Sequence, residues 1–441
     1  MKHIKLKKGY DIRIDGDFSD PKIKDDFIVP DLVAVKPIDF TGIKEKLMVK
    51  EGDKVKIGTP LFYAKHDDRI KFVSPVSGEV KSIVRGERRK VLEIVVENDK
   101  KSERLDLSVK DGNREEILDS LLKSGVFPTI RQRPFNKIAD VDKIPRDIFI
   151  SFFDSAPLGV DFLFIANQYD GELKKGIEVF KKLTNGSIYI GVNSDNIPKI
   201  DGVEFVKFTG PHPSGTVGIQ IHHISPIKGK NDIVWGLDLS DLIRVGTLFK
   251  EKKFPDCKIV KAVGTNSLNP GYYKVTNGAK INSFVEAKEN SRVVSGNLLT
   301  GRNVGNEGYL GFYDNLISII PEPNEAKFLG WSMPGFGVES YSRTMITGFM
   351  SKLKKFNIDA GINGGKRAFI SSGNYETVVP MDIYPVYLIK AILAEEIEEM
   401  EALGIYEVSE EELALCEFIC PSKIEWQEIV RKGLDLMEKE A

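Results

Sequence analysis

Phe208 to Ile224, with the sequence FTGPHPSGTVGIQIHHI, is the stretch on which the interpretation of the fold depends. Its two prolines fix their own φ angles and bias the residues before them towards extended backbone, and its three glycines permit backbone shapes that other residues resist. Three of the five histidines of the chain lie in it. We interpret the stretch as a tightly shaped connector. It is either a ligand or docking site or a loop between two strands with solvated histidines.

The segments before this stretch alternate between strand and helix patterns. Residues 148–153, 187–192 and 203–208 are apolar runs typical of buried strands, and residues 173–183 carry apolar side chains at helical spacing. This order predicts a Rossmann-like α/β domain with a largely parallel sheet over residues 106–255. The opening stretch follows the last of these strands, at the edge where open α/β sheets usually bind ligands.

Residues 1–105 are predicted to form an all-β domain because short β-rich runs in it are separated by glycines. Within it, VKEGDKVKIGTPL (49–61) and SPVSGEVKSI (74–83) resemble the two halves of a biotinyl- or lipoyl-type β-sandwich. Such domains carry a modified lysine at the turn between the halves, but Asp67 stands there. We therefore expect this fold without the carrier function.

The C-terminal half is predicted to contain two further domains. Residues 256–330 return to β patterning with many glycines and asparagines, which resembles a β-grasp module of the SLBB type. Residues 331–441 are mixed and then helical, which predicts a helical bundle. The glutamate runs in this last part, including 395–399 and 410–412, are interpreted as solvated helical faces.

Composition describes an ordinary globular protein with few special features. The chain has 441 residues, of which 41% are hydrophobic, and a net charge of −2, which does not favour nucleic-acid binding. Three cysteines fit a reducing compartment. The N-terminus has no apolar signal region, and no run approaches the roughly 18 apolar residues of a membrane span. We expect a cytoplasmic chain with no transmembrane segment.

Motifs for metals and common cofactors are incomplete in this sequence. His222 and His223 are adjacent and would face opposite sides of a strand, so we expect no metal site there. Cys416 to Pro421, CEFICP, keeps only the final C-x₃-C-P of a ferredoxin-type cluster motif. Two thiolates cannot hold a four-iron cluster, so the favoured interpretation is two buried helix cysteines. No catalytic residue is predicted.

The segment TIRQRPFNK (129–137) carries two arginines and a lysine around Pro134-Phe135. It is either a basic loop with one aromatic ring packed inward or a site for anions or carbonyl oxygens with an aromatic lid. A quinone head group would need donors at its two carbonyls and a flat apolar wall.

Several motifs together resemble the A subunits of bacterial Na⁺-translocating NADH:quinone reductases over essentially the whole chain. The similar segments are residues 125–138 (GVFPTIRQRPFNKI), 208–224, 272–281 (YYKVTNGAKI), 295–302 (SGNLLTGR) and 416–434 (CEFICPSKIEWQEIVRKGL). The architecture also resembles the C subunit of Rnf complexes and the flavin-carrying subunit of respiratory complex I. This sequence lacks the cluster cysteines of those relatives.

The resemblance implies a peripheral subunit on the cytoplasmic side of the bacterial inner membrane. It would have five partner subunits, chiefly the membrane-embedded B subunit. The complex would oxidise NADH, reduce ubiquinone and export Na⁺, with flavins and a 2Fe–2S cluster on partner subunits and no cofactor bound covalently by this chain.

On this basis we predict that the chain helps to bind ubiquinone and has no turnover alone. The predicted head-group neighbours are Arg131, Arg133, Phe135 and Lys137, with His212 as a further donor. Two alternatives stay open: a structural docking subunit without a ligand site, and an electron-transfer subunit with a bound flavin or iron–sulfur cluster.

Overall fold

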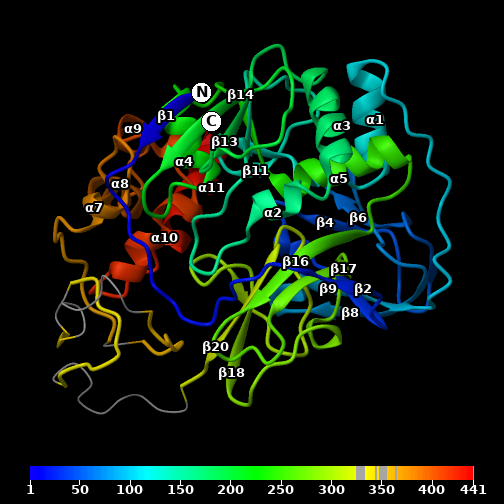
Figure 1. Cartoon of the computed structure of the whole chain (residues 1–441). Helices are drawn as coiled ribbons and strands as arrows, with labels where there is room; N and C mark the ends of the chain where they lie inside the picture. Colours follow the sequence, from blue (N-terminus) through cyan, green and yellow to red (C-terminus); the bar gives the residue numbers. More distant parts are fainter. Residues whose placement is uncertain (324–332, 343–344, 347–354, 363–364, 441) are drawn as a thin grey trace.

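The structure is a computed structural model that describes residues 1–323, 333–342, 345–346, 355–362 and 365–440. A seven-stranded sheet, with the order β1-β14-β13-β12-β15-β10-β11, occupies one half of the molecule (Figure 1). Its strands are β1 (Lys2–Lys5), β14 (Glu204–Thr209), β13 (Ile188–Val192), β12 (Ile148–Ser151), β15 (Val234–Asp238), β10 (Arg131–Arg133) and β11 (Lys137–Ile138). The first five are parallel neighbours, and the last two add an antiparallel edge. The predicted α/β layer with a largely parallel sheet is therefore confirmed, whereas its Rossmann-like class and its bounds of 106–255 stay predictions.

Helices accompany this sheet. They are α1 (Arg114–Lys123), α2 (Phe162–Ala166), α3 (Asp170–Lys181), α4 (Val217–Ile224) and α5 (Leu239–Glu251). Helices α2 to α5 lie along the chain between or after its parallel strands, and α1, which precedes β10, packs on β7 (Asp67–Val73) of the N-terminal region. Helices α3 and α5 approach closely at Gly246, where an added Cβ would lie 1.9 Å from the carbonyl oxygen of Glu172. The Asp238 side chain caps α5 by accepting from the N–H of Asp241 at 2.9 Å.

The second half of the opening stretch differs from the prediction. We interpreted residues 217–224 as loop or strand, but they form α4, which packs on β12 and β15. The physical reason is topological, because two parallel strands, β14 and β15, need a crossover connection, and a helix supplies it. His222 and His223 therefore lie on a helix rather than on opposite faces of a strand.

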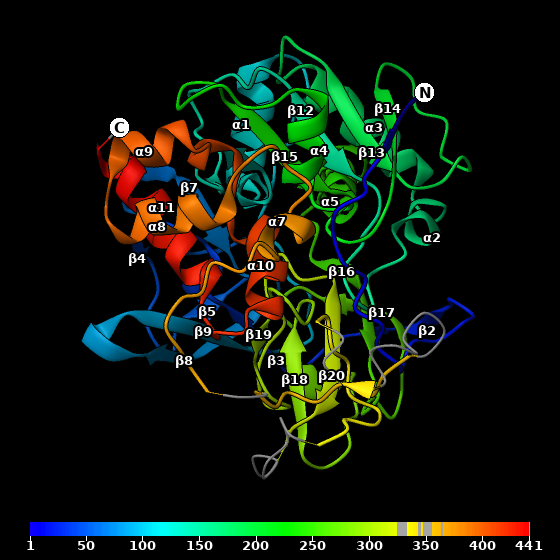
Figure 2. The same ribbon diagram turned by 90° about the vertical axis from the view of Figure 1, so that its left-hand side faces the viewer.

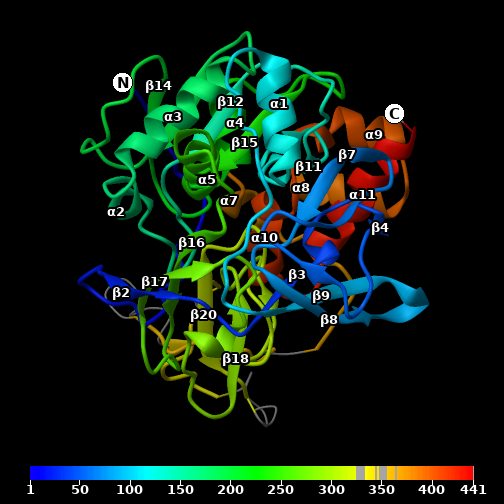
Figure 3. The same ribbon diagram turned by 90° about the vertical axis from the view of Figure 1, so that its right-hand side faces the viewer.

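Three further sheets form the other half of the molecule. A six-stranded sheet contains β19 (Arg302–Asn303), β18 (Ser291–Ser295), β20 (Leu316–Pro321), β16 (Cys257–Val263), β17 (Gly271–Thr276) and β2 (Ile23–Ile28) in this order. A four-stranded sheet contains β3 (Leu32–Val35), β9 (Val91–Asn98), β8 (Gly78–Arg85) and β5 (Lys54–Val55), with β8 and β9 forming the long ribbon in Figure 3. A three-stranded sheet contains β4 (Glu45–Leu47), β6 (Pro60–Ala64) and β7 (Asp67–Val73).

The first 30 residues cross between these sheets. β1 pairs with β14 of the seven-stranded sheet, and β2 pairs with β17 of the six-stranded sheet, so both leave the predicted first domain. The biotinyl/lipoyl and β-grasp classes stay predictions. Residues 324–332, at the predicted boundary of the third and fourth domains, lie outside the described residues.

The last part of the chain is a group of helices beside the α/β layer (Figure 2). They are α7 (Tyr375–Val378), α8 (Pro385–Leu393), α9 (Ile397–Ala402), α10 (Glu410–Ile419) and α11 (Trp426–Glu440). One continuous cluster of buried apolar side chains joins these helices to the α/β domain and to the N-terminal sheets. Within the described ranges, we find no helix with both the length and the apolar character that crossing a bilayer requires.

Candidate functional site

A cavity of about 180 Å³ lies where the parallel strands end. Ser151 ends β12 and Asp238 ends β15, and both line this cavity. Phe153 and Phe162 add aromatic wall, and His212 lines it from the opening stretch. The location agrees with the rule that open α/β sheets bind ligands outside the carboxyl ends of their strands.

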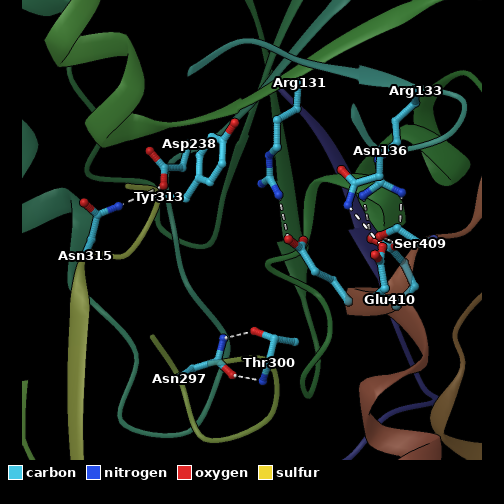
Figure 4. Close-up of polar contacts among 12 residues, drawn as sticks. Arg131, Arg133, Asn136, Asp238, Asn297, Thr300, Tyr313, Asn315, Ser409 and Glu410 are labelled. Carbon is cyan, nitrogen blue, oxygen red and sulfur yellow. Dashed lines mark hydrogen bonds and ion pairs between the residues drawn. The ribbon is translucent and has the colours of Figure 1, made fainter. Parts of the chain in front are cut away.

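Arg131 lies at the border of this cavity and contacts the C-terminal helices (Figure 4). Its Nη1 donates to a carboxylate oxygen of Glu411 on α10 at 2.8 Å, and its guanidinium lies 5.4 Å from the ring centre of Tyr313. Burial alone would raise the pKa of Glu411, but the positive charges of Arg131 and Arg133 hold it below its usual value. The Arg131–Glu411 pair is therefore charged and fixed in place.

Arg133 forms an ion pair with a different carboxylate. Its Nη1 and Nη2 donate to the two oxygens of Glu412 at 3.1 and 3.3 Å, and both side chains are almost fully buried, with exposed fractions of 4% and 0%. One Glu412 oxygen also accepts from the N–H and hydroxyl of Ser409 at 2.8 and 2.6 Å, which caps α10. Arg133 thus holds the start of α10 against β10.

The turn after Arg133 continues this contact. Phe135 is buried and meets the ring of Tyr406 edge to face at 5.8 Å. The Lys137 ammonium pairs with Glu438 of α11. We call the three pairs Arg131–Glu411, Arg133–Glu412 and Lys137–Glu438 the basic clasp, since together they tie β10 and β11 to the helical region.

The clasp corrects the interpretation of one glutamate run. Residues 410–412 were predicted to be a solvated helical face, but Glu411 and Glu412 pair with arginines of the α/β domain and Glu410 accepts from Arg431 at 3.2 Å. The reason is tertiary: charge neutralisation comes from residues about 280 positions away, which local sequence pattern does not reveal.

His212 is buried beside the cavity. Its Nδ1 lies 3.0 Å from the Ser155 hydroxyl oxygen, and its backbone N–H donates to Asp11 at 2.9 Å. Burial lowers the pKa of the imidazole to about 4, so the ring is neutral at neutral pH. A neutral imidazole beside a cavity can exchange a hydrogen bond with a polar ligand without adding charge.

The other two histidines of the opening stretch hold the C-terminal region. His222 Nδ1 lies 2.8 Å from a carboxylate oxygen of Glu407, and its Nε2 accepts from the N–H of Asp382 at 3.0 Å. His223 Nε2 lies 2.7 Å from the Pro380 carbonyl oxygen. They are bonded rather than solvated, so their role in this structure is to fix loops on α4.

Three carboxyl groups, of which Asp241 is buried and Asp154 and Asp238 are half-buried, are the part of the site that the sequence did not predict. Asp154, Asp238 and Asp241 all line the cavity, and burial raises the pKa of each. For Asp241, burial and the nearby charge of Asp238 raise the pKa to about 8. Asp238 also accepts from the Asn315 amide at 2.9 Å (Figure 4). The available signal was an aspartate shortly after each of two buried apolar strands.

A second cavity of about 300 Å³ adjoins the first. Arg131, Tyr313 and Glu411 line both, whereas Asn136 and Lys137 line only the second of the two. Arg133 and Phe135 line neither of these two cavities. Of the five predicted site residues, Arg131 and His212 thus line the first cavity, and Lys137 lines the second. Arg133 and Phe135 are buried in contacts with the helical region.

In the part of the chain that the structure describes, no group of three or more histidine, cysteine, aspartate or glutamate side chains is placed to hold a metal ion. Cys416 lies in α10 and Cys420 ends it, and both are buried, as expected from the sequence.

Comparisons with known proteins agree over the whole chain. Residues 4–99 match the family model described as "NqrA N-terminal barrel-sandwich hybrid domain", and residues 112–254 match "NqrA second alpha/beta domain". The A subunit of the Na(+)-translocating NADH-quinone reductase of Hahella chejuensis is 34% identical, over 99% of this chain and 100% of the relative. The corresponding subunits of Histophilus somni and Pasteurella multocida are each 35% identical with the same coverage.

Proposed function

Because the chain belongs to the family of A subunits of Na⁺-translocating NADH-quinone reductases, we propose that it contributes to ubiquinone binding and reduction in that complex and has no turnover alone. The complex as a whole is an NADH:quinone oxidoreductase that moves Na⁺. The observation that carries the proposal is the cavity where Arg131 and His212 meet an aromatic wall.

The chemistry of a quinone head group fits the residues around this cavity. A quinone is flat and apolar apart from two carbonyl oxygens, so it needs donors at two positions and apolar side chains on its faces. Arg131 and His212 are the proposed donors, and Phe153, Phe162 and Tyr313 are the proposed wall. Lys137 lies in the adjoining cavity, through which a longer ligand would extend. Arg133 and Phe135 act by holding the turn that positions Arg131.

The proposal keeps the remaining expectations of the family resemblance. The chain sits on the cytoplasmic side of the inner membrane and has five partner subunits, chiefly the membrane-embedded B subunit. Flavins and the 2Fe–2S cluster belong to partner subunits. A purified chain whose visible spectrum has flavin or iron–sulfur bands would contradict this distribution of cofactors.

Turnover of the assembled complex tests the cavity. Thr300 is exposed and lines both cavities, so Thr300→Trp would place an indole ring where they adjoin without disturbing the core. We expect a complex with this variant to show a raised KM for ubiquinone and unchanged NADH oxidation with an artificial acceptor. Ser283→Trp, at an exposed position outside both cavities, is the control. An unchanged KM in the Thr300→Trp complex would refute the assignment.

The alternative of a structural subunit without a ligand site is favoured by the basic clasp. The three basic side chains of the RQRPFNK segment already have carboxylate partners in the same chain. This alternative predicts that Thr300→Trp changes neither assembly nor any kinetic constant, whereas clasp variants reduce the amount of assembled complex.

A further inference from the structure

Helix α8 lies at the margin of the molecule (Figure 2) and exposes large aromatic and apolar side chains. Tyr384 just before the helix, and Tyr387 and Leu393 within it, have exposed fractions of 62%, 61% and 58%. The two tyrosine rings meet edge to face with centres 6.1 Å apart. The exposed Lys390 between Tyr387 and Leu393 donates to the Ser371 hydroxyl at 3.0 Å. On its inner side the same helix is buried through residues such as Leu388 and Ile389. Large side chains grouped in this way on a surface mark an interaction site more often than scattered ones do.

An uncompensated acidic group follows directly in the chain. Glu395, Glu396, Glu398 and Glu399 are all exposed. In the described part of the chain none of them has a lysine or arginine nitrogen within 4.0 Å. The sequence itself offers no local partner, since no lysine or arginine occurs between Lys390 and Lys423.

Other helices of this protein neutralise their surface charges within one turn. Lys123–Asp119, Lys174–Asp170 and Lys432–Glu428 are all i,i+4 ion pairs at 2.6–2.7 Å. Glu398 and Glu399 lie in the first turn of α9, where the helix dipole favours negative charge, and Glu396 is its N-cap residue. Unlike the charges of those ion pairs, this acidic group has no lysine or arginine partner in the described part of the chain, and a partner with positive charge would neutralise it.

We propose that Tyr384, Tyr387 and Leu393 together with these four glutamates form a docking surface, here called the α8–α9 edge. Its occupant is a lysine- and arginine-rich segment with apolar side chains on a partner subunit of the complex. Carboxylates and tyrosine faces both attract guanidinium and ammonium groups, while the exposed leucine and tyrosine rings take apolar side chains.

Charge decides against the other two candidate occupants. A second copy of this chain would place one acidic group against another, which is unfavourable at a self-complementary interface. The anionic lipids of a cytoplasmic leaflet would be repelled by the same carboxylates. The inference depends on membership in a multi-subunit complex and is independent of whether the cavity binds ubiquinone.

Retention of the chain in the purified complex tests the α8–α9 edge. The complex is isolated through a tag on another subunit, then washed at increasing NaCl concentration, and the amount of this chain is measured. We expect Glu398→Lys with Glu399→Lys, and separately Tyr387→Ala with Leu393→Ala, to release the chain at clearly lower salt than the wild type. Exposed residues elsewhere supply matched controls: Glu286→Lys with Glu289→Lys, and Leu268→Ala.

A photocrosslink then identifies the occupant. Benzoylphenylalanine incorporated in place of Tyr387 is irradiated in the intact complex, and the adduct is mapped by mass spectrometry. An adduct with a lysine- or arginine-rich peptide of another subunit supports the proposal. Adducts only with lipid or with a second copy of this chain would overturn it, as would equal release of edge and control variants or no adduct at all. Circular dichroism of the purified variants shows whether each is folded.

Discussion

Removal of Arg133 from the basic clasp is the sharpest perturbation that the structure offers. Arg133→Met keeps most of the side-chain volume and removes the guanidinium, which leaves the Glu412 carboxylate buried without its cation. Breaking a buried pair from one side costs about 3–5 kcal/mol. Ser409 continues to donate to Glu412, so we expect about 3 kcal/mol rather than the upper value.

A double-mutant cycle separates the pair from the packing around it. Glu412→Gln removes the charge, keeps an acceptor for Ser409, and is expected to cost about 2 kcal/mol. The double variant with Arg133→Met and Glu412→Gln should cost clearly less than the sum of the two single costs, with an interaction energy of about 2 kcal/mol. The reason is that each single variant leaves one buried charge without a partner, whereas the double variant leaves none.

Hydrogen exchange of the α10 amides is the appropriate assay, since it reports the stability of this helix without assuming two-state unfolding of a multidomain chain. Arg69→Met is the control. Arg69 also contacts two carboxylates, Asp67 and Asp142, but its side chain is 44% exposed, so its loss should cost less than about 1 kcal/mol. Additive costs in the cycle, or an Arg133→Met effect no larger than that of the control, would refute the reasoning.

Three further predictions concern buried groups. The folded pKa of His212, about 4, lies below the unfolded value of about 6.5, so stability should fall as pH drops through this window, and His212→Gln should flatten the fall in pH-dependent denaturation. The folded pKa of Asp241, about 8, lies above the unfolded value of about 3.9, so the stability of the folded state should fall as pH rises between these two values. Asp241→Asn should remove this loss of stability, and an unchanged pH dependence of stability in the variant would contradict the prediction. Gly246→Ala should destabilise α5 by about 1–3 kcal/mol in hydrogen exchange of its amides because of the Glu172 carbonyl, whereas Gly229→Ala, with open space around it, should not.

The order of strands and helices in the α/β domain could be predicted from periodicity, because its strands are continuous apolar runs and its helices are amphipathic. Residues 217–224 could not, since VGIQIHHI is rich in β-branched residues and only the crossover to β15 makes it a helix. Likewise, the pairing of β1 with β14 joins residues about 200 positions apart, and no local pattern indicates it.

The candidate site was found only in part. Arg131 and His212, predicted from the sequence, line the cavity, and their contact with a ligand stays a prediction. The partners of the basic segment lie on α10 and α11, so their identity is a property of the tertiary fold. Asp154 and Asp238 carried a usable signal, an aspartate shortly after a buried strand at the ligand-binding edge. The distinction between Arg131, which lines the cavities, and Arg133, which is buried in a pair, required the structure.

Calorimetric titration of the full-length chain with a soluble ubiquinone analogue tests the proposed role most directly. We expect saturable binding at one site by the wild type and by Ser283→Trp, and loss of this binding in Thr300→Trp. Absence of saturable binding by the wild type, or equal affinity in the Thr300→Trp chain, would contradict that role.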